Sequence, residues 1–475
     1  MAEQDAALTL FAGVFSRGDV DAGDAAWLQA LLDAEAGLAR ALERAGLAPS
    51  GAGAAVTRAA VAADLSAAEV AEVARASELT GNPVPGLARV LGRRVPGFAA
   101  PAVHRGATSQ DIMDTAAMLL ARRATEVIRR DLMTAAGAAA GLARRHRDTL
   151  MIGRTLLQQA VPVTFGVVAA GWLAGLDEAV TGLDALAEAR LAVQFGGAAG
   201  TLASLGDDGP AVTALLADEL GLAVPPLPWH TERLRVIDAA VAMARVTAAL
   251  GKIARDVTLL AQTEVGEVAE GAAGGQPAGA PRRGGSSAMP NKRNPVASVA
   301  ILGCSRQVPG LLATLVACAE QELQRAAGAW HAEWQPFSDI LRLAGSAAAW
   351  GADLLGGLTV DAEQMAANLA ATGGLPLAER VTGLLAGALG RPAAHDLVAG
   401  AAVRAVSAGV PLRDVLLAMP AVEQASVTAD HVDAALDPAG YLGAAGEFVD
   451  AALHAHEELS TRDHHGQRDE ENDHG

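Results

Sequence analysis

The run DIMDTAAMLLARRATEVIRRDLMTAAGAAAGLARRHRD, residues 111–148, has the composition and spacing of one long helix. Ile112, Ala116 and Leu119 fall on one helical face, whereas arginines such as Arg122 and Arg129 fall largely elsewhere. Alanine and leucine, both strong helix formers, dominate the run. At the usual rise per residue, about thirty residues span on the order of 45 Å. Such a helix hides only part of its apolar surface within one chain, so we expect it to belong to a large bundle.

Four further runs share this character, at about residues 161–193, 231–270, 295–324 and 334–358. Hydrophobic residues make up 51% of the chain and aromatic residues only 3%, and strand-forming residues do not alternate with period two. The sequence therefore predicts an all-α protein. We expect an N-terminal helical domain (1–103), a central bundle of five long helices (104–358), a C-terminal helical domain (359–460) and a disordered tail (461–475).

The charge balance restricts the partners of this chain. Thirty-six basic and 54 acidic residues give 36 − 54 = −18, a balance that repels nucleic acid and anionic membranes. An anionic substrate would therefore need a local positive pocket. The longest apolar run, residues 161–176, is shorter than the roughly 20 residues of a membrane span. We expect no nucleic-acid partner and no membrane partner.

Cysteine usage and the N-terminus indicate a cytoplasmic protein. Cys304 and Cys318 form neither a disulfide framework nor a metal-ligand pattern, and we interpret both as buried thiols. The N-terminus carries no apolar leader segment. Without a ligand cluster or a nucleotide-binding fingerprint, no metal and no organic cofactor are expected.

Three polar segments interrupt the apolar helices. The first polar segment is HRGATSQDIMDT (104–115), the second is GRTLLQQAVP (153–162), and the third is GGSSAMPNKRNP (284–295). Each lies at a break or at a predicted helix start, where unpaired backbone N–H groups can bind an anion.

The third polar segment has the composition of an anion-binding loop. Gly284 and its neighbour permit backbone conformations closed to other residues, and consecutive N–H groups in such a turn can form a concavity for an anion. Ser286 and Ser287 add hydroxyls, Lys292 adds a point charge and Asn294 adds a donor. These groups would suit a carboxylate that gains charge during a reaction. The alternative interpretation is a surface turn whose charged residues serve solubility.

The other two segments have ordinary interpretations when each is taken alone. Thr108 and Ser109 could simply cap a helix, with Asp111 completing the cap three residues later. Thr155 and Gln158 could satisfy nearby backbone groups. His104, in the same way, could be a surface histidine.

Taken together, the three segments resemble the signature regions of the fumarase/aspartase superfamily. GSSAMPNKRNP resembles its GSSxMPxKxNP loop, HRGATSQDIMDT resembles its HxGxTSxDxxDT region, and GRTLLQQAVP resembles its GxTHxQxAxP region. The resemblance covers about residues 5–455. It implies a three-domain helical subunit and a homotetramer with a twenty-helix core. It also implies active sites that each take their three segments from three subunits.

Two more stretches resemble the branch of bacterial carboxymuconate cycloisomerases, which close a lactone in the protocatechuate branch of the β-ketoadipate pathway. They are QRAAGAWHAEWQP (324–336) and PLPWHTERLR (226–235). Leu156 stands where fumarases and adenylosuccinate lyases carry a catalytic histidine, and a phosphate-binding arginine is replaced near Trp334. Both departures speak against an adenylosuccinate lyase. Leu234 stands where an aspartate is expected, which weakens the assignment of Arg233 and Arg235.

The resemblance implies roles for individual residues. Ser286 is the expected proton carrier with Ser287 beside it, and Lys292 is expected to stabilise a doubly charged aci-carboxylate intermediate. His331, like His104, is a candidate for orientation or proton transfer. The residues expected to bind substrate are His104, Thr108, Ser109, Arg154, Thr155, Gln158, Arg233, Arg235, Met289 and Asn294.

Three functions are compatible with these residues. The first is a lactonising cycloisomerase that acts on a small polycarboxylate. The second is another β-eliminating lyase acting on a substituted succinate, such as a nitrosuccinate-type or adenylosuccinate-type C–N lyase. The third is a non-catalytic helical scaffold, as in the lens crystallins related to this superfamily. A scaffold has no need of the Ser/Lys/Asn loop, which therefore favours an enzyme.

Overall fold

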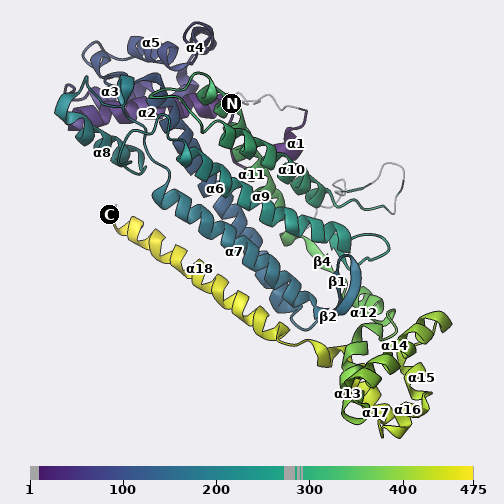
Figure 1. Ribbon diagram of the computed structural model, residues 1–475. Coiled ribbons are helices and arrows are strands. Elements are labelled where there is room, and N and C mark those ends of the chain that lie inside the picture. Colours follow the sequence, from purple (N-terminus) through teal and green to yellow (C-terminus); the bar gives the residue numbers. More distant parts are fainter. Residues whose placement is uncertain (1–9, 272–283, 286–288, 290–291, 474–475) are drawn as a thin grey trace. The chain divides into compact units, whose positions relative to one another are not determined.

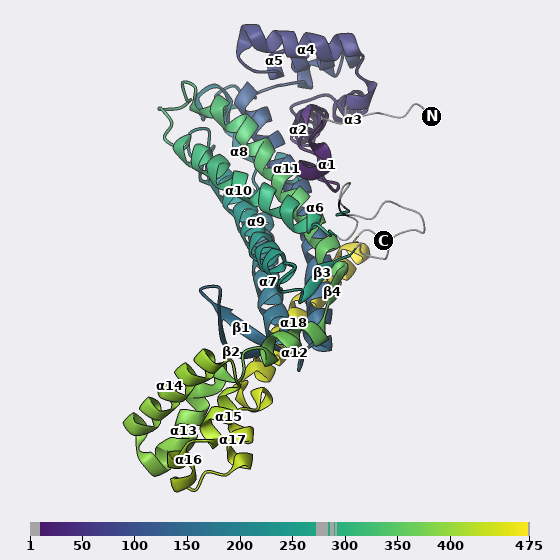
Figure 2. The same ribbon diagram turned by 90° about the vertical axis from the view of Figure 1, so that its right-hand side faces the viewer.

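The computed structural model describes residues 10–271, 284–285, 289 and 292–473, with side chains as far as residue 461. Within these residues the chain is built almost wholly of helices, and its strands form only two small two-stranded sheets (Figures 1 and 2). The prediction of an all-α protein is confirmed.

All five predicted long helices are present in the middle of the chain. They are α6 (Ser109–Arg145), α7 (Phe165–Ala189), α9 (Leu234–Leu260), α10 (Val296–Ala317) and α11 (Ala329–Gly356). The 37 residues of α6 make it the longest of the five. Ile112, Ala116 and Leu119, predicted to share one face, are all buried. The helical spacing of apolar residues therefore located these helices correctly.

Shorter helices flank the long ones. Before α6 lie α1 (Ala12–Phe15), α2 (Asp24–Arg44), α3 (Ala52–Ala59), α4 (Ala67–Thr80) and α5 (Val84–Arg94), and α8 (Gly209–Leu220) precedes α9. After α11 lie α12 (Ala362–Ala370), α13 (Ala378–Leu389), α14 (Arg391–Ala408), α15 (Leu412–Leu417), α16 (Pro420–Gln424), α17 (Ala429–Ala435) and α18 (Ala445–Asp473).

The chain forms two compact units, each assembled from three separate segments. Unit 1 comprises residues 1–133, 178–252 and 299–351, and unit 2 comprises residues 134–177, 253–298 and 352–475. The long helices thus contribute segments to both units. The three consecutive domains expected from the sequence stay a prediction.

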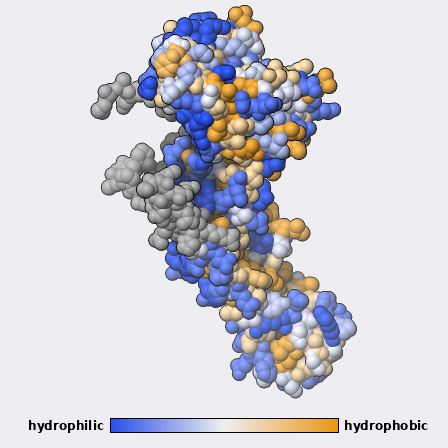
Figure 3. Space-filling view, turned by 90° about the vertical axis from the view of Figure 1, so that its left-hand side faces the viewer, coloured by the Kyte–Doolittle hydropathy of each residue, from blue (hydrophilic) through white to orange (hydrophobic). Residues whose placement is uncertain are grey.

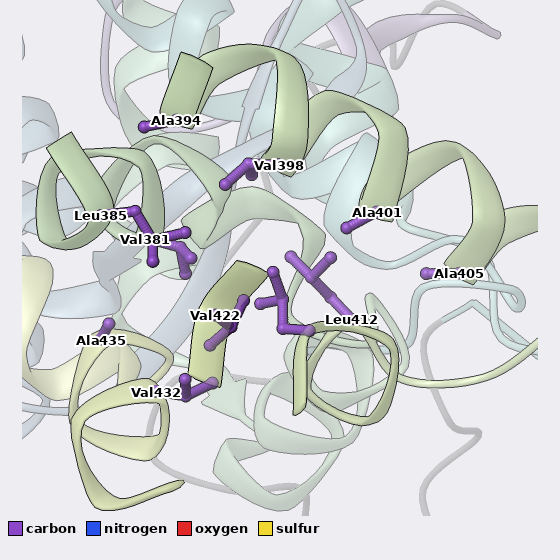
Figure 4. Packing of buried hydrophobic residues seen from close by; sticks show 11 residues of the cluster. Val381, Leu385, Ala394, Val398, Ala401, Ala405, Leu412, Val422, Val432 and Ala435 are labelled. Atoms are coloured by element: carbon purple, nitrogen blue, oxygen red, sulfur yellow. The ribbon is translucent and has the colours of Figure 1, made fainter. Parts of the chain in front are cut away.

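The helices after α12 have a small apolar core of their own. Figure 4 shows side chains from α13, α14 and α17 converging on those of the short helices α15 and α16. Val381, Leu385 and Leu412 are at most 1% exposed there. Burying such side chains stabilises each of them by about 1.5–3 kcal/mol, which helps to explain how helices as short as five residues persist.

The disorder expected for residues 461–475 stays a prediction, and the structure describes the chain there as the end of α18. α18 continues through the polar run and ends at Asp473. Glutamate, glutamine and arginine are good helix formers, the run contains no proline, and extending an existing helix requires no new nucleus. Before the run, α18 is tied to the segment around α7 by the 2.9 Å contact between His456 Nδ1 and Asp177 Oδ1, and to Arg147 by Asp450.

A β-hairpin lies where the sequence predicted only a break between α6 and α7. β1 (Leu150–Thr155) pairs antiparallel with β2 (Gln158–Thr164). The register shifts between Ile152 and Arg154, and Pro162 interrupts the second strand. These irregularities explain why no period-two alternation was visible. The second small sheet pairs β3 (Val268–Glu270) with β4 (Leu358–Val360).

The hairpin turn consists of Leu156 and Leu157. Thr155 pairs with Gln158, so only these two residues form the turn. Their φ angles are 51° and 62°, the left-handed values that a type I′ turn requires. Such turns favour Asn-Gly, so a pair of leucines carried no turn signal. Leu156 is 97% exposed and Leu157 is 66% exposed.

Replacing Leu156 by Asn and Leu157 by Gly should raise the thermal unfolding midpoint. A left-handed conformation costs a residue with a bulky side chain about 1–2 kcal/mol, whereas glycine adopts it without this cost. The control is Leu227→Gly, because Leu227 is also largely exposed but has no positive φ. A lower midpoint in the double variant would contradict this expectation and would mean that the leucines make stabilising contacts.

Candidate active site

The first polar segment leads directly into α6. The backbone N–H of Thr108 donates to Asp111 Oδ2 at 2.9 Å, which is half of the predicted capping interaction, and Ser109 is the first residue of the helix. Both side chains are half-buried. Among the residues that the structure describes, neither hydroxyl has a hydrogen-bond partner. Both hydroxyls are therefore free to bind a ligand.

Asp111 joins the first polar segment to two other parts of unit 1. Its buried carboxylate accepts hydrogen bonds from the N–H groups of Gly196 at 3.0 Å and Gly197 at 2.9 Å, and it lies 2.6 Å from His230 Nε2. Gly197 has φ +67°, and a Cβ on Gly196 would lie 2.7 Å from the Pro228 side chain. The two glycines therefore let the backbone approach the carboxylate closely, which fixes the start of α6.

Arg233, predicted to bind substrate, instead lies between two buried carboxylates. Its Nη1 is 2.7 Å from Asp114 Oδ2 and its Nη2 is 2.6 Å from Glu333 Oε2. The indole N–H of Trp330 also donates to Asp114, at 3.0 Å. Burial raises the pKa of Glu333 above its ordinary value, although the hydrogen bond and the charge of Arg233 oppose this. Arg233 thus neutralises protein carboxylates in the structure.

The other two predicted arginines also have partners within the protein. Arg235 Nη1 donates to the carbonyl oxygens of Ala189 and Arg190, at the C-terminal end of α7. Arg154 makes two hydrogen bonds, of 2.9 and 2.7 Å, to the carboxylate of Glu267, whose side chain has no exposed surface. Arg154 is therefore positioned by a buried anion of its own chain.

The second polar segment forms the exposed end of the hairpin. Thr155 and Gln158 both lie on the surface, on either side of the two leucines. Gln158 Nε2 is 3.3 Å from the carbonyl oxygen of the adjacent Leu157. Leu156, at the position of the superfamily histidine, has an apolar side chain that is almost fully exposed to solvent.

The two ends of the third polar segment are closed against each other. The backbone N–H of Asn294 donates to the carbonyl oxygen of Gly284 at 2.9 Å, and its side-chain amide donates to the same oxygen at 3.1 Å. Gly284 has φ +77°, and a Cβ there would lie 2.3 Å from Asn294 O, so this position requires glycine. Asn294, expected to contact substrate, therefore closes the loop through its amide.

The proposed proton carriers Ser286 and Ser287 lie outside the described residues, as does most of the glycine-rich run before them. Met289 and Lys292 are described. The N–H of Lys292 donates to Met289 O at 3.1 Å, and both side chains are exposed.

A carboxylate occupies the N-terminus of α10, directly after the third polar segment. Glu270 accepts hydrogen bonds from the N–H groups of Ala297 and Ser298, both at 2.9 Å, and from the Ser298 hydroxyl at 2.6 Å. The sequence indicated that free N–H groups at such helix starts can bind an anion. At α10 a carboxylate of the protein binds there instead. Glu270 is the last residue of β3, and Glu267 comes just before that strand. One short stretch of chain therefore binds both Arg154 of the hairpin and the start of α10.

The structure places the three segments in two units. The first polar segment belongs to unit 1, and the second and third belong to unit 2. His331 lies in unit 1 within an aromatic cluster, with its ring centroid 5.1 Å from that of Trp330 and 4.8 Å from that of Trp334. Among the described residues, no group of three or more His, Cys, Asp or Glu side chains is placed to hold a metal ion.

The carboxylates that position these segments were not predicted from the sequence. Arg233 is bound by Asp114 and Glu333, and Arg154 is bound by Glu267. Glu270 binds the first turn of α10, which follows the third polar segment. A usable signal existed, because an isolated acid within an apolar stretch must find a partner when the stretch is buried. Which donor it finds is not visible from the spacing of residues.

Comparison with known proteins agrees with this fold and these segments. Residues 21–310 match the Lyase family and residues 374–452 match the family described as the adenylosuccinate lyase C-terminus. The chain is 46% identical over 387 residues to 3-carboxy-cis,cis-muconate cycloisomerase of Pseudomonas aeruginosa, covering 81% of this chain and 83% of that protein. It is 48% identical over 383 residues to nitrosuccinate lyase of Streptomyces davaonensis, covering 78% and 79%.

A solved structure extends the similarity over nearly the whole chain. The 3-carboxy-cis,cis-muconate lactonizing enzyme from Pseudomonas putida superposes with a TM-score of 0.86 at 40% identity, covering 95% of this chain and 99% of that one. A helical subunit with three such polar segments defines a lyase-type enzyme. The chain belongs to the Lyase family of the fumarase/aspartase superfamily.

Replacing Arg233 by Met should destabilise the protein by about 3–5 kcal/mol, because Asp114 and Glu333 would be left buried without their counter-ion. Thermal unfolding should show the loss, and it should be smaller at acid pH, where these carboxyls accept protons. The control is Arg123→Met, which breaks the surface pair with Asp33 and should cost less than about 1 kcal/mol. An unchanged midpoint with a raised KM would instead assign Arg233 to the substrate.

Proposed function

We propose that this chain is a 3-carboxy-cis,cis-muconate cycloisomerase of the protocatechuate branch of the β-ketoadipate pathway. The observation that carries the proposal is similarity to proteins of that name across most of the chain, including 46% identity over 81% of it. Leu156 adds support, because a leucine cannot be the proton donor that fumarases and adenylosuccinate lyases use at that position.

In the lactonising direction one substrate carboxylate forms a C–O bond to a carbon of the conjugated diene. The displaced electron pair moves onto the adjacent carboxylate as an aci-carboxylate, and the carbon next to it then takes a proton. The substrate trianion thereby becomes a lactone dianion with uptake of one proton, so the free acids are isomers. The barrier lies in the aci-carboxylate, which carries two negative charges on one group.

The third polar segment is proposed to stabilise that intermediate. Lys292 supplies a positive charge and the backbone N–H groups supply donors, while Asn294 keeps the ends of the loop closed through its bonds to Gly284. Ser286 gives its proton to the carbon and recovers one from water, and Ser287 donates beside it. A serine needs such surroundings because its ordinary pKa disfavours the alkoxide.

The hydroxyls of the first polar segment, together with Thr155 and Gln158, are proposed to bind the remaining carboxylates. Thr108 and Ser109 support this assignment, because their hydroxyls have no partner among the described residues. Arg154, Arg233 and Arg235 act instead as positioning groups, since protein carboxylates and carbonyls already accept their hydrogen bonds.

We further propose a cytoplasmic homotetramer in which three subunits build each active site. The support is the apolar surface of the long helices. Leu234 and Val241 on α9, and Val299 and Val316 on α10, are between 40% and 58% exposed. By length and composition alone, α10 is apolar enough to cross a membrane. Only 28% of its most apolar window is buried within the subunit. Figure 3 shows hydrophobic residues lying among polar ones on one face of the molecule. Packing against further copies would cover the apolar surface.

A nitrosuccinate lyase is the second candidate, supported by 48% identity over 78% of the chain. It would use the same three segments for proton removal beside a carboxylate, followed by loss of a nitrogen leaving group.

Adding the purified protein to 3-carboxy-cis,cis-muconate should abolish the ultraviolet absorbance of the diene, because ring closure removes the conjugation. Nitrosuccinate, fumarate and adenylosuccinate should be turned over at least about a hundredfold more slowly. Binding one of them would leave buried polar groups of the site without a hydrogen-bond partner, and such a mismatch disfavours an analogue strongly. Release of nitrite from nitrosuccinate at the faster rate would decide for the second candidate.

Ser286→Ala and Ser287→Ala, made separately, test the third polar segment. One of them should lower kcat by at least about a hundredfold, the size of effect typical for a group that transfers a proton in the transition state. Light scattering should show the same assembly as in the parent protein, so that loss of activity is not loss of structure. Near-parental rates in both variants would exclude a serine as the proton carrier.

A further inference from the structure

Glu35 is a carboxylate without exposed surface in the middle of α2. Both of its oxygens contact a single residue of the first polar segment. Oε2 accepts the backbone N–H of His104 at 2.8 Å, and Oε1 lies 2.7 Å from His104 Nδ1. One buried carboxylate therefore holds the backbone and the ring of the same histidine.

This clamp acts at a point where the backbone is strained. His104 has φ 57°, a left-handed value that is uncommon outside glycine although histidine tolerates it better than most residues. Gly106 follows with φ +80°, and a Cβ on Gly106 would lie 2.8 Å from the Leu205 side chain. The chain thus makes two left-handed turns just before Thr108, and Glu35 holds the first of them.

The charges around the ring favour its protonated form. Burial by itself would lower the pKa of His104, but the hydrogen bond and charge of Glu35 on α2, together with the charge of Asp111 on α6, raise it above its ordinary value. Asp111 contacts His230 on its other side, and the adjacent Arg105 donates to the carbonyl oxygen of Leu47. The carboxylates thus outweigh the desolvation of the imidazolium.

The second ring nitrogen of His104 has no partner among the residues that the structure describes. The side chain is 25% exposed, so this N–H can reach a ligand. It belongs to the same short segment as the unpartnered hydroxyls of Thr108 and Ser109. An oriented cation beside two hydroxyls is suited to binding a carboxylate.

We propose that Glu35 is a positioning residue that locks His104 in its left-handed conformation as an imidazolium, so that His104 Nε2 donates a hydrogen bond to a carboxylate of the substrate. The inference deepens the proposed function and rests on it for the identity of the substrate. His104 is in this account a resident cation, and it transfers no proton during the reaction.

Glu35→Gln is the first test, because glutamine keeps the shape of the side chain but removes its charge. A pKa raised in the folded protein means that His104 is charged below that value and loses its charge as pH rises through it. The variant should lower that pKa, so the alkaline rise in KM should move to lower pH. At a pH between the titration midpoints of the parent and the variant we expect KM to rise at least about tenfold, equivalent to about 1.4 kcal/mol of binding, with kcat changed much less. Below both midpoints the difference should shrink.

Two further variants separate positioning from simple stability. His104→Asn keeps a residue that tolerates the left-handed conformation and a donor, but carries no charge. Its KM should be high at every pH and should not follow the profile of the parent. Glu43→Gln is the matched control on the same helix, because Glu43 also accepts two backbone N–H groups, from Gly51 and Gly53, away from His104. Glu43→Gln should leave the pH profile unchanged even if it lowers the unfolding midpoint.

Histidine NMR titration of the full-length protein keeps this inference separate from the proposed substrate. The His104 resonance, assigned with His104→Asn, should titrate above the ordinary range and move down in Glu35→Gln but not in Glu43→Gln. That result in a protein inactive on carboxymuconate would leave the clamp standing and overturn only the proposed function. An ordinary titration of His104 that Glu35→Gln does not change, or a KM in that variant equal to the parent at every pH, would overturn the inference.

Discussion

The structure depends on pairing carboxylates that long apolar helices have taken out of water. An unpaired buried charge costs several kcal/mol, so each such group needs donors that other parts of the chain must supply. Asp111 obtains them from Gly196, Gly197 and His230, and Asp114 obtains them from Arg233. These bonds fix where α6 begins, and the polar segment that precedes α6 inherits its position from them.

The same requirement organises the other polar segments. Glu267 and Glu270 lie within one short stretch of chain and bind Arg154 of the hairpin and the first turn of α10. In this way buried acids position groups that would otherwise be expected to bind an anionic substrate. Among the described residues, the groups without a hydrogen-bond partner are of other kinds: the hydroxyls of Thr108 and Ser109, the Lys292 ammonium and one ring nitrogen of His104. A substrate with several carboxylates would thus be bound by a few oriented donors and not by a cluster of arginines.

The long helices and the polar segments were predictable because residues close together in the sequence specify them. Apolar residues recur along α6 and α11 with helical spacing, and the three polar segments together, with GSSAMPNKRNP the most specific of them, resemble the signature of a superfamily. The hairpin was not predictable, because a turn built from Leu156 and Leu157 lacks the glycine and asparagine that mark such turns. The polar composition at the end of α18 is compatible both with disorder and with extension of an existing helix, so the composition alone does not decide between them.

The sequence by itself determined the all-α class, the five long helices, the family and the location of the three polar segments. Only the tertiary structure decided which charges remain free. In the sequence, Arg233 cannot be distinguished from a substrate-binding arginine. In the structure it is buried between Asp114 and Glu333, which lie 119 and 100 positions away from it in the chain. Glu35 and His104 meet across 69 positions in the same way. Partners at such separations are chosen by how the helices pack, and no local pattern of residues records that choice.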